Sequence, residues 1–158
     1  SLSKEAIDNF VERFEKCHSG PYPNQEENPH IADEFGADAE LFIDKVGSKW
    51  IQIWDEGIYR SSDNRCEIYL DTAWYPPSDM ILEIYRQMAE IDSDVKVSGK
   101  YWDEGHQPIG VFEVYYGQII SEEQSIDDDE DQEYFWDDVI EPAFEILQER
   151  LDKVMKEI

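Results

Sequence analysis

Carboxylate side chains are the groups of this chain whose spacing comes nearest to a recognisable chemical site. The first, third, fifth and twelfth positions of a twelve-residue loop are filled by Asp127, Asp129, Asp131 and Asp138. Those positions ligate Ca²⁺ in a helix–loop–helix calcium site, whose sixth position needs glycine for a sharp turn. Here the sixth position is Gln132, and the twelfth lacks the longer bidentate glutamate. The run therefore fits a solvated charge segment better than a calcium site.

Cysteine and histidine side chains are the other possible metal ligands. The candidates are Cys17, His18, His30, Cys66 and His106. No CxxC, HxxxH or HExxH spacing occurs among them, and such spacings are what bring two ligands to one metal ion. Two cysteines are also too few for a disulfide scaffold, so a reduced, cytoplasmic setting is the simpler interpretation. We expect neither a metal nor a cofactor.

General acid–base chemistry has one compact candidate, the turn-rich segment 103–108. Asp103, Glu104 and His106 lie close together there, and a carboxylate beside an imidazole is able to exchange protons. Exposed loops carry such residues for solubility too, and the chain has neither a phosphate-binding glycine loop nor a nucleophile elbow. The sequence therefore favours a non-enzymatic protein. The alternative is a small-ligand-binding protein or hydrolase with a pocket between the sheet and the loop at 21–38.

Charge restricts the possible partners more than any motif does. The chain has 39 acidic and 13 basic residues and a net charge of −26, and no Lys or Arg occurs from Tyr101 to Glu149. A polyanion repels the phosphate backbone and anionic lipid, so direct binding to DNA, RNA or a membrane surface is not expected. No apolar run approaches the roughly 20 residues that cross a bilayer. We expect a basic protein partner that is engaged by an acidic surface. This leaves two alternatives, an interaction with a basic nucleic-acid-binding protein or a mimic of nucleic acid.

The acids expected to contact this partner share the basic-free stretch of the chain. They are Glu122, Glu123, Asp127, Asp128, Asp129, Glu130, Asp131, Glu133, Asp137, Asp138, Glu141 and Glu145. If the charge exists to meet a partner, these side chains should form one continuous face. The competing interpretation is that the acidity serves only solubility.

Apolar periodicity predicts the elements that position these groups. Helices are expected at 4–17 (with Ser3 as N-cap), at 79–91 (after Ser78) and at 141–157, preceded by a helical turn at 134–140. Strands are expected at about 48–56, 65–74, 94–103 and 109–118. This order predicts an α+β fold with a four-stranded antiparallel sheet and the helix at 79–91 on one face. The residues expected to be buried are Trp50, Ile68, Leu70, Ile81, Tyr85, Val97 and Val114.

The last helix has an apolar seam in steps of four and three residues, from Ile140 to Ile158. The seam spans fewer heptads than a coiled coil needs, so it is expected to pack on the chain's own sheet. A monomer or a weak dimer follows from this.

Three short stretches carry a family resemblance: 47–50 (GSKW), 72–77 (TAWYPP), and 101–105 (YWDEG) followed by Gly110. In this order they resemble the YubB-type ferredoxin-like domain family, which occurs largely on plasmids, phages and genomic islands. The resemblance implies a ferredoxin-like ββαββ core at 40–118. The chain length predicts a single domain, 1–158. An acidic segment (119–133) and a C-terminal helical extension (134–158) follow this core. No catalytic residue is implied, and Trp50, Trp74 and Trp102 are expected to be core or sheet-face aromatics.

Overall fold

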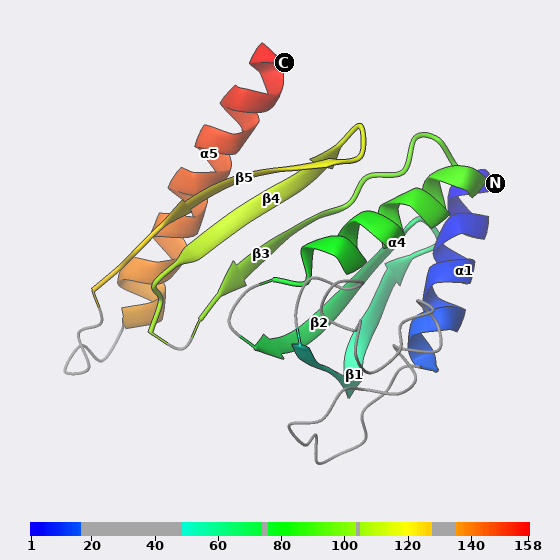
Figure 1. The fold of residues 1–158 in the computed structure, drawn as a ribbon, viewed down its shortest axis with the longest axis horizontal. Coiled ribbons are helices and arrows are strands. Elements are labelled where there is room, and N and C mark those ends of the chain that lie inside the picture. Colours follow the sequence, from blue (N-terminus) through cyan, green and yellow to red (C-terminus); the bar gives the residue numbers. More distant parts are fainter. Residues whose placement is uncertain (17–48, 74–75, 104, 128–134) are drawn as a thin grey trace. The chain divides into compact units, whose positions relative to one another are not determined.

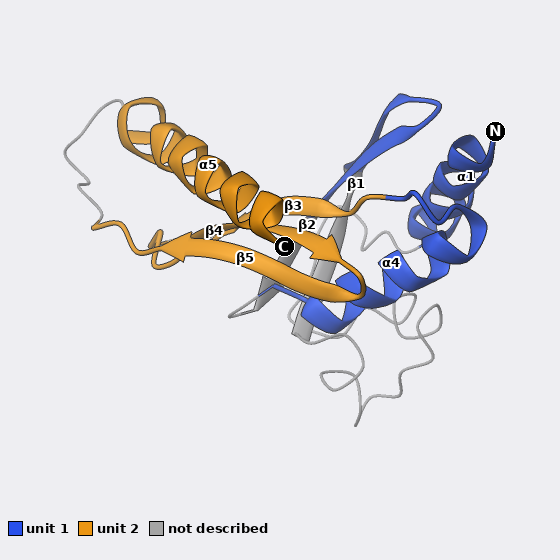
Figure 2. Cartoon of the chain, turned by 90° about the horizontal axis from the view of Figure 1, so that it is seen from above, with its two compact units in different colours: residues 1–95 blue, residues 96–158 orange. Residues whose placement is uncertain are grey.

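The chain divides into two compact units, residues 1–95 and residues 96–158 (Figures 1 and 2). The computed structural model describes residues 1–16, 49–73, 76–103, 105–127 and 135–158. Side chains are described for these residues except 49–56 and 70–73. The helices and antiparallel strands confirm the predicted α+β class.

The described part of unit 1 contains two helices and a hairpin. Helix α1 (Leu2–Glu15) and helix α4 (Ser78–Ile91) pack side by side (Figure 1), and strands β1 (Lys49–Ser62) and β2 (Arg65–Ala73) pair antiparallel. The helices share a core with one end of the hairpin, formed by Ala6, Phe10, Phe14, Met80, Ile84 and Met88 with Ile58, Cys66 and Ile68. An apolar stripe on each helix thus buries itself against the other helix and the hairpin.

Helices α1 and α4 begin close to the predicted residues, but neither uses the predicted cap. The side chain of Ser1, not that of Ser3, accepts a hydrogen bond from the Lys4 amide at 3.2 Å. In α4 the N-cap is Pro77, and Ser78 is already helical. Proline leaves α4 without a side-chain cap, so Asp79 in the first turn provides the favourable charge at this end.

The residues of unit 2 that the structure describes form a three-stranded meander covered by one long helix. Strands β3 (Ser98–Trp102), β4 (Ile109–Tyr115) and β5 (Gln118–Gln124) lie in that order and pair antiparallel. A π-helical turn, η1 (Trp136–Ile140), leads into α5 (Glu141–Glu157), which lies along β4 and β5 (Figure 1). The buried residues of α5 pack on the sheet. The core between them contains Ile109, Val111, Ile126, Ile140, Ala143, Phe144, Leu147 and Leu151. The predicted final helix and the helical turn before it are therefore confirmed.

The sheet differs from the prediction in one strand and in its connectivity. The described strands form a two-stranded and a three-stranded sheet, and a single four-stranded sheet is not shown. Residues 118–124, predicted as the end of a strand and the start of a polar acidic segment, form the edge strand β5. Tyr116 and Gly117 both have positive φ (48° and 76°), which is the two-residue turn that joins tightly paired strands. Polar residues on an edge strand prevent it from pairing with a further strand. Because of these polar residues, the sequence of β5 resembles that of a loop.

Burial follows the prediction for some residues only. Ile81 and Val114 are buried, whereas Ile68, Tyr85 and Val97 are half-buried. The side chains of Trp50 and Leu70 lie outside the described residues, as does Trp74. Trp102 is a sheet-face aromatic as predicted, but 48% of its surface is exposed.

Candidate interaction surface

The two glutamates of β5 lie on opposite faces of the unit 2 sheet. Glu122 is opposite Val111, which belongs to the core beneath α5, whereas Glu123 is opposite Gly110 on the other face. Successive side chains of a strand point to opposite sides, so a strand cannot present two adjacent acids to one partner. The expected single acidic face therefore does not include both glutamates.

Glu123 also has a partner within the protein. The Tyr101 hydroxyl donates a hydrogen bond to the Glu123 carboxylate, with 2.6 Å between the oxygens. Burial, followed by this carboxylate, raises the pKa of Tyr101 well above its usual range. Tyr101 lies across the sheet from Gly110, where a Cβ atom would come within 2.1 Å of the tyrosine ring. Gly110 is therefore required by the close approach of Tyr101, and this contact explains two residues of the third stretch singled out in the sequence.

Helix α5 presents the most regular row of acids in the described part of unit 2. Glu141, Glu145 and Glu149 recur every four residues and all three are exposed. Four residues of α-helix rise about 6 Å, and side chains at this spacing lie one above another on one face. Phe144, Leu147 and Leu151 occupy the opposite, buried face. We call Glu141, Glu145 and Glu149 the α5 acidic row.

Part of this row is not among the residues predicted to contact a partner. Glu149 is absent from that set, although it continues the four-residue step from Glu141 and Glu145. Asp152 lies on the same side of the helix three residues further on and accepts a hydrogen bond from Gln148 at 2.9 Å. The helical repeat of exposed acids was the signal that could have found both.

The remaining candidate acids lie before α5. Asp127 is exposed after β5, and Asp137 and Asp138 are exposed in η1. Asp128, Asp129, Glu130, Asp131 and Glu133 lie outside the described residues, and the possible calcium loop lies largely there too. Asp137 and Asp138 thus lie in η1, directly before the helix that carries Glu141 and Glu145.

The candidate metal ligands and the acid–base segment have structural roles where the structure describes them. Cys17, His18 and His30 lie outside the described residues; within them, no group of three or more His, Cys, Asp or Glu side chains is arranged to hold a metal ion. Burial raises the pKa of the Cys66 thiol, which favours its unreactive protonated form. The Asp103 carboxylate accepts a hydrogen bond from the Gln107 amide at 2.7 Å and thereby closes the β3–β4 loop.

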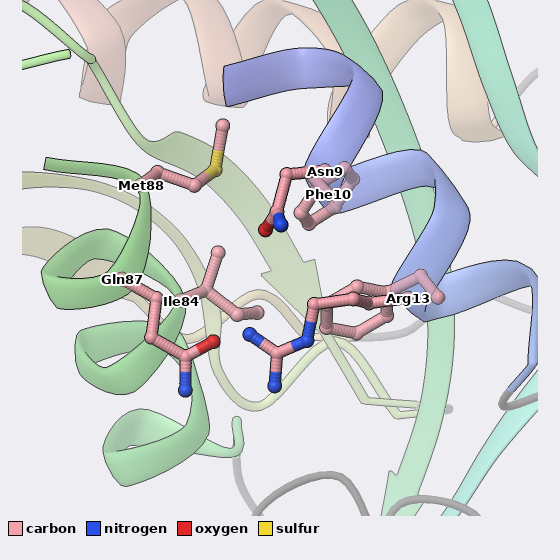
Figure 3. A pocket seen from close by; sticks show the side chains of 7 residues that line it. Asn9, Phe10, Arg13, Ile84, Gln87 and Met88 are labelled. Atoms are coloured by element: carbon pink, nitrogen blue, oxygen red, sulfur yellow. The ribbon is translucent and has the colours of Figure 1, made fainter. Parts of the chain in front are cut away.

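A small hollow lies between α1 and α4 in unit 1 (Figure 3). It is lined by Asn9, Phe10, Arg13, Phe14, Ile84, Gln87 and Met88. Its volume of about 10 Å³ suffices for about one water molecule and not for a substrate. The pocket of the alternative hypothesis involves the loop at 21–38, which lies outside the described residues.

Comparison with known proteins identifies the family to which the chain belongs. Residues 53–142, more than half of the chain, match the family model described as a ferredoxin-like domain in Api92-like protein. The chain therefore belongs to this family of ferredoxin-like domains, and the matched range crosses the boundary between the two units. No curated protein and no solved structure matches the chain. None of the described helices combines the length and the apolar composition that crossing a bilayer requires.

Proposed function

We propose that this protein is a non-enzymatic, acidic interaction module that binds a basic protein. The observation that carries the proposal is the α5 acidic row: three exposed carboxylates on one helix face, with no salt bridge between described residues of unit 2 to neutralise them. A concentrated negative potential of this kind attracts a positive cleft and accelerates encounter with it.

The positive cleft is that of a nucleic-acid-binding protein. Carboxylates repeated along a rigid helix offer such a cleft negative charges in place of phosphates, and the chain itself repels nucleic acid. The resemblance to YubB-type domains of plasmids, phages and genomic islands supports a role for a mobile element in the cytoplasm of its host, as an inhibitor or a counter-defence protein. This association is by family only.

The proposal that the chain itself does not bind nucleic acid can be tested by gel shift. The isolated protein should give no gel shift with duplex DNA or RNA at physiological salt, because it offers no basic patch from which counterions are released. A micromolar shift with the unmodified protein would contradict the proposed mimicry.

Affinity capture from a host lysate tests the partner class. At low salt the protein should retain basic nucleic-acid-binding proteins, and these should elute at about 0.5 M salt because screening then acts within a few ångströms. A variant with Glu141, Glu145 and Glu149 changed to Lys should retain much less. Retention of the same proteins by the variant, with unchanged salt sensitivity, would show that the charge serves solubility alone.

A further inference from the structure

Two tryptophans in unit 2 remain substantially exposed where β3 meets the start of α5. Trp102 is 48% exposed and Trp136 is 40% exposed. Their rings meet edge to face with 5.3 Å between centroids, and both contact Phe144, at 5.9 and 6.3 Å. We call Trp102, Trp136 and Phe144 the aromatic cluster. Indole surface exposed beside a packed phenyl ring is typical of interaction sites, where tryptophan is a preferred anchor.

The aromatic cluster already holds a cation. The Lys100 ammonium lies over the Phe144 ring, 5.4 Å from its centroid. This distance is within the range in which the negative face of an aromatic ring attracts a positive charge. The rings of Trp102 and Trp136 are better acceptors of the same interaction, because tryptophan has the strongest ring quadrupole.

Carboxylates border the cluster along the chain. Asp137 and Asp138 follow Trp136 in η1, and Glu141 begins α5; these three acids are exposed. The Asp103 carboxylate, which follows Trp102, is engaged by the Gln107 amide. Lys100 is the only described Lys or Arg of β3, the β3–β4 loop, η1 and the first two turns of α5, and the imidazole of His106 lies beside Trp136 with 6.1 Å between ring centroids. A cation on the cluster would thus meet aromatic faces and negative charge together.

We infer that the aromatic cluster binds an arginine side chain from a basic segment of the partner protein. Arginine fits both features, since its planar guanidinium stacks on aromatic faces and bonds carboxylates at its edge. Charge complementarity excludes the other occupants. Phosphate head groups and nucleic acid are repelled by the bordering acids, and a second copy of the chain would place like charges against one another. The inference rests on the proposed function and names the chemistry that its partner must present.

Titration with oligoarginine, followed by calorimetry, tests the inference. The double variant Trp102→Leu, Trp136→Leu should bind this peptide about tenfold more weakly than the wild type, from the loss of two cation–π contacts. Tyr116→Leu is the matched control: it removes an aromatic ring that is 83% exposed at the opposite end of the β4–β5 hairpin, and affinity should not change. Oligolysine of equal length should bind the wild type more weakly and lose less in the double variant.

A second measurement avoids any effect of the substitutions on folding. In the wild type, oligoarginine should shift the indole N–H resonances of Trp102 and Trp136. Absence of these shifts, or an unchanged affinity of a folded double variant, would overturn the inference.

The result separates the two levels of the hypothesis. If Glu141→Lys, Glu145→Lys, Glu149→Lys weakens peptide binding and the tryptophan variant does not, the acidic surface stands and the aromatic site is wrong. If only the tryptophan variant weakens binding, the aromatic site stands and the acidic row is wrong. If neither variant nor added salt changes binding, both are wrong.

Discussion

The two units carry equal shares of the net charge of −26, yet their described carboxylates are used differently. In unit 1, Asp8 pairs with Lys4 and with Arg60, and Arg86 bridges two glutamates of α4. Among the described residues of unit 2 there is no salt bridge, and Glu123 instead accepts a hydrogen bond from a neutral tyrosine. Paired acids serve the fold, whereas exposed acids without an ion pair between described residues are available to an external cation. Net charge alone does not distinguish these two uses.

The core beneath α5 is what holds the acidic row in place, and weakening it should have the largest effect. Leu147 is fully buried, so Leu147→Ala should lower the free energy of unfolding by about 2–5 kcal/mol through lost burial and a residual cavity. Ile146, its neighbour on the same helix, is 48% exposed, and Ile146→Ala should cost less than about 1 kcal/mol. Urea unfolding measures both. Equal losses would mean that α5 does not pack on the sheet through the face described.

The contact between Tyr101 and Gly110 should give the next largest effect. Gly110→Ala forces the tyrosine ring to move and breaks its hydrogen bond to Glu123, at a cost of about 1–3 kcal/mol. Gly105→Ala is the matched control, because the nearest atom to an added Cβ there is 3.8 Å away. Thermal unfolding should separate the two variants. A Gly110→Ala protein as stable as the control would remove the structural explanation of this motif residue.

The sequence predicted most elements but missed those defined by tertiary contact. Helix α5 was predicted because Phe144, Leu147 and Leu151 repeat at helical spacing. Strand β5 was missed because only Ile119 and Ile120 are apolar and the rest of the strand is a polar edge. The acids were identified by composition, yet composition could not reveal that Glu122 and Glu123 face opposite ways or that Glu123 bonds Tyr101. Nor did any spacing connect Trp102 with Trp136, which meet only because β3 lies beside η1 and α5.

The paired acids of unit 1 should leave a signature at low pH. Hydrogen bonds from Arg86 and then Gln87 lower the pKa of Glu83 to about 2 from its usual 4.5, against the opposing effect of burial. A depressed carboxyl pKa stabilises the fold above pH 4.5, and this contribution is lost as the pH falls towards about 2. Glu83→Gln should remove this contribution to the pH dependence of the free energy of unfolding. The contribution is less than about 1 kcal/mol, because the ion pair between Glu83 and Arg86 is partly solvated.

Urea midpoints measured across this acid range check the assignment. A Glu83→Gln protein whose slope of stability against pH equals that of the wild type would contradict the assignment.

The most direct test of the central claim compares two variants of identical net charge. One changes Glu141, Glu145 and Glu149 of the acidic row to Lys; the other changes Glu12, Glu15 and Asp63 of unit 1, which are also exposed, to Lys. The measurement is the association rate of oligoarginine at low salt. The row variant should associate about tenfold more slowly, and the unit 1 variant should stay close to the wild type, because a local potential steers the encounter. Equal slowing of both variants would show that only total charge matters and would contradict the acidic row as a binding surface.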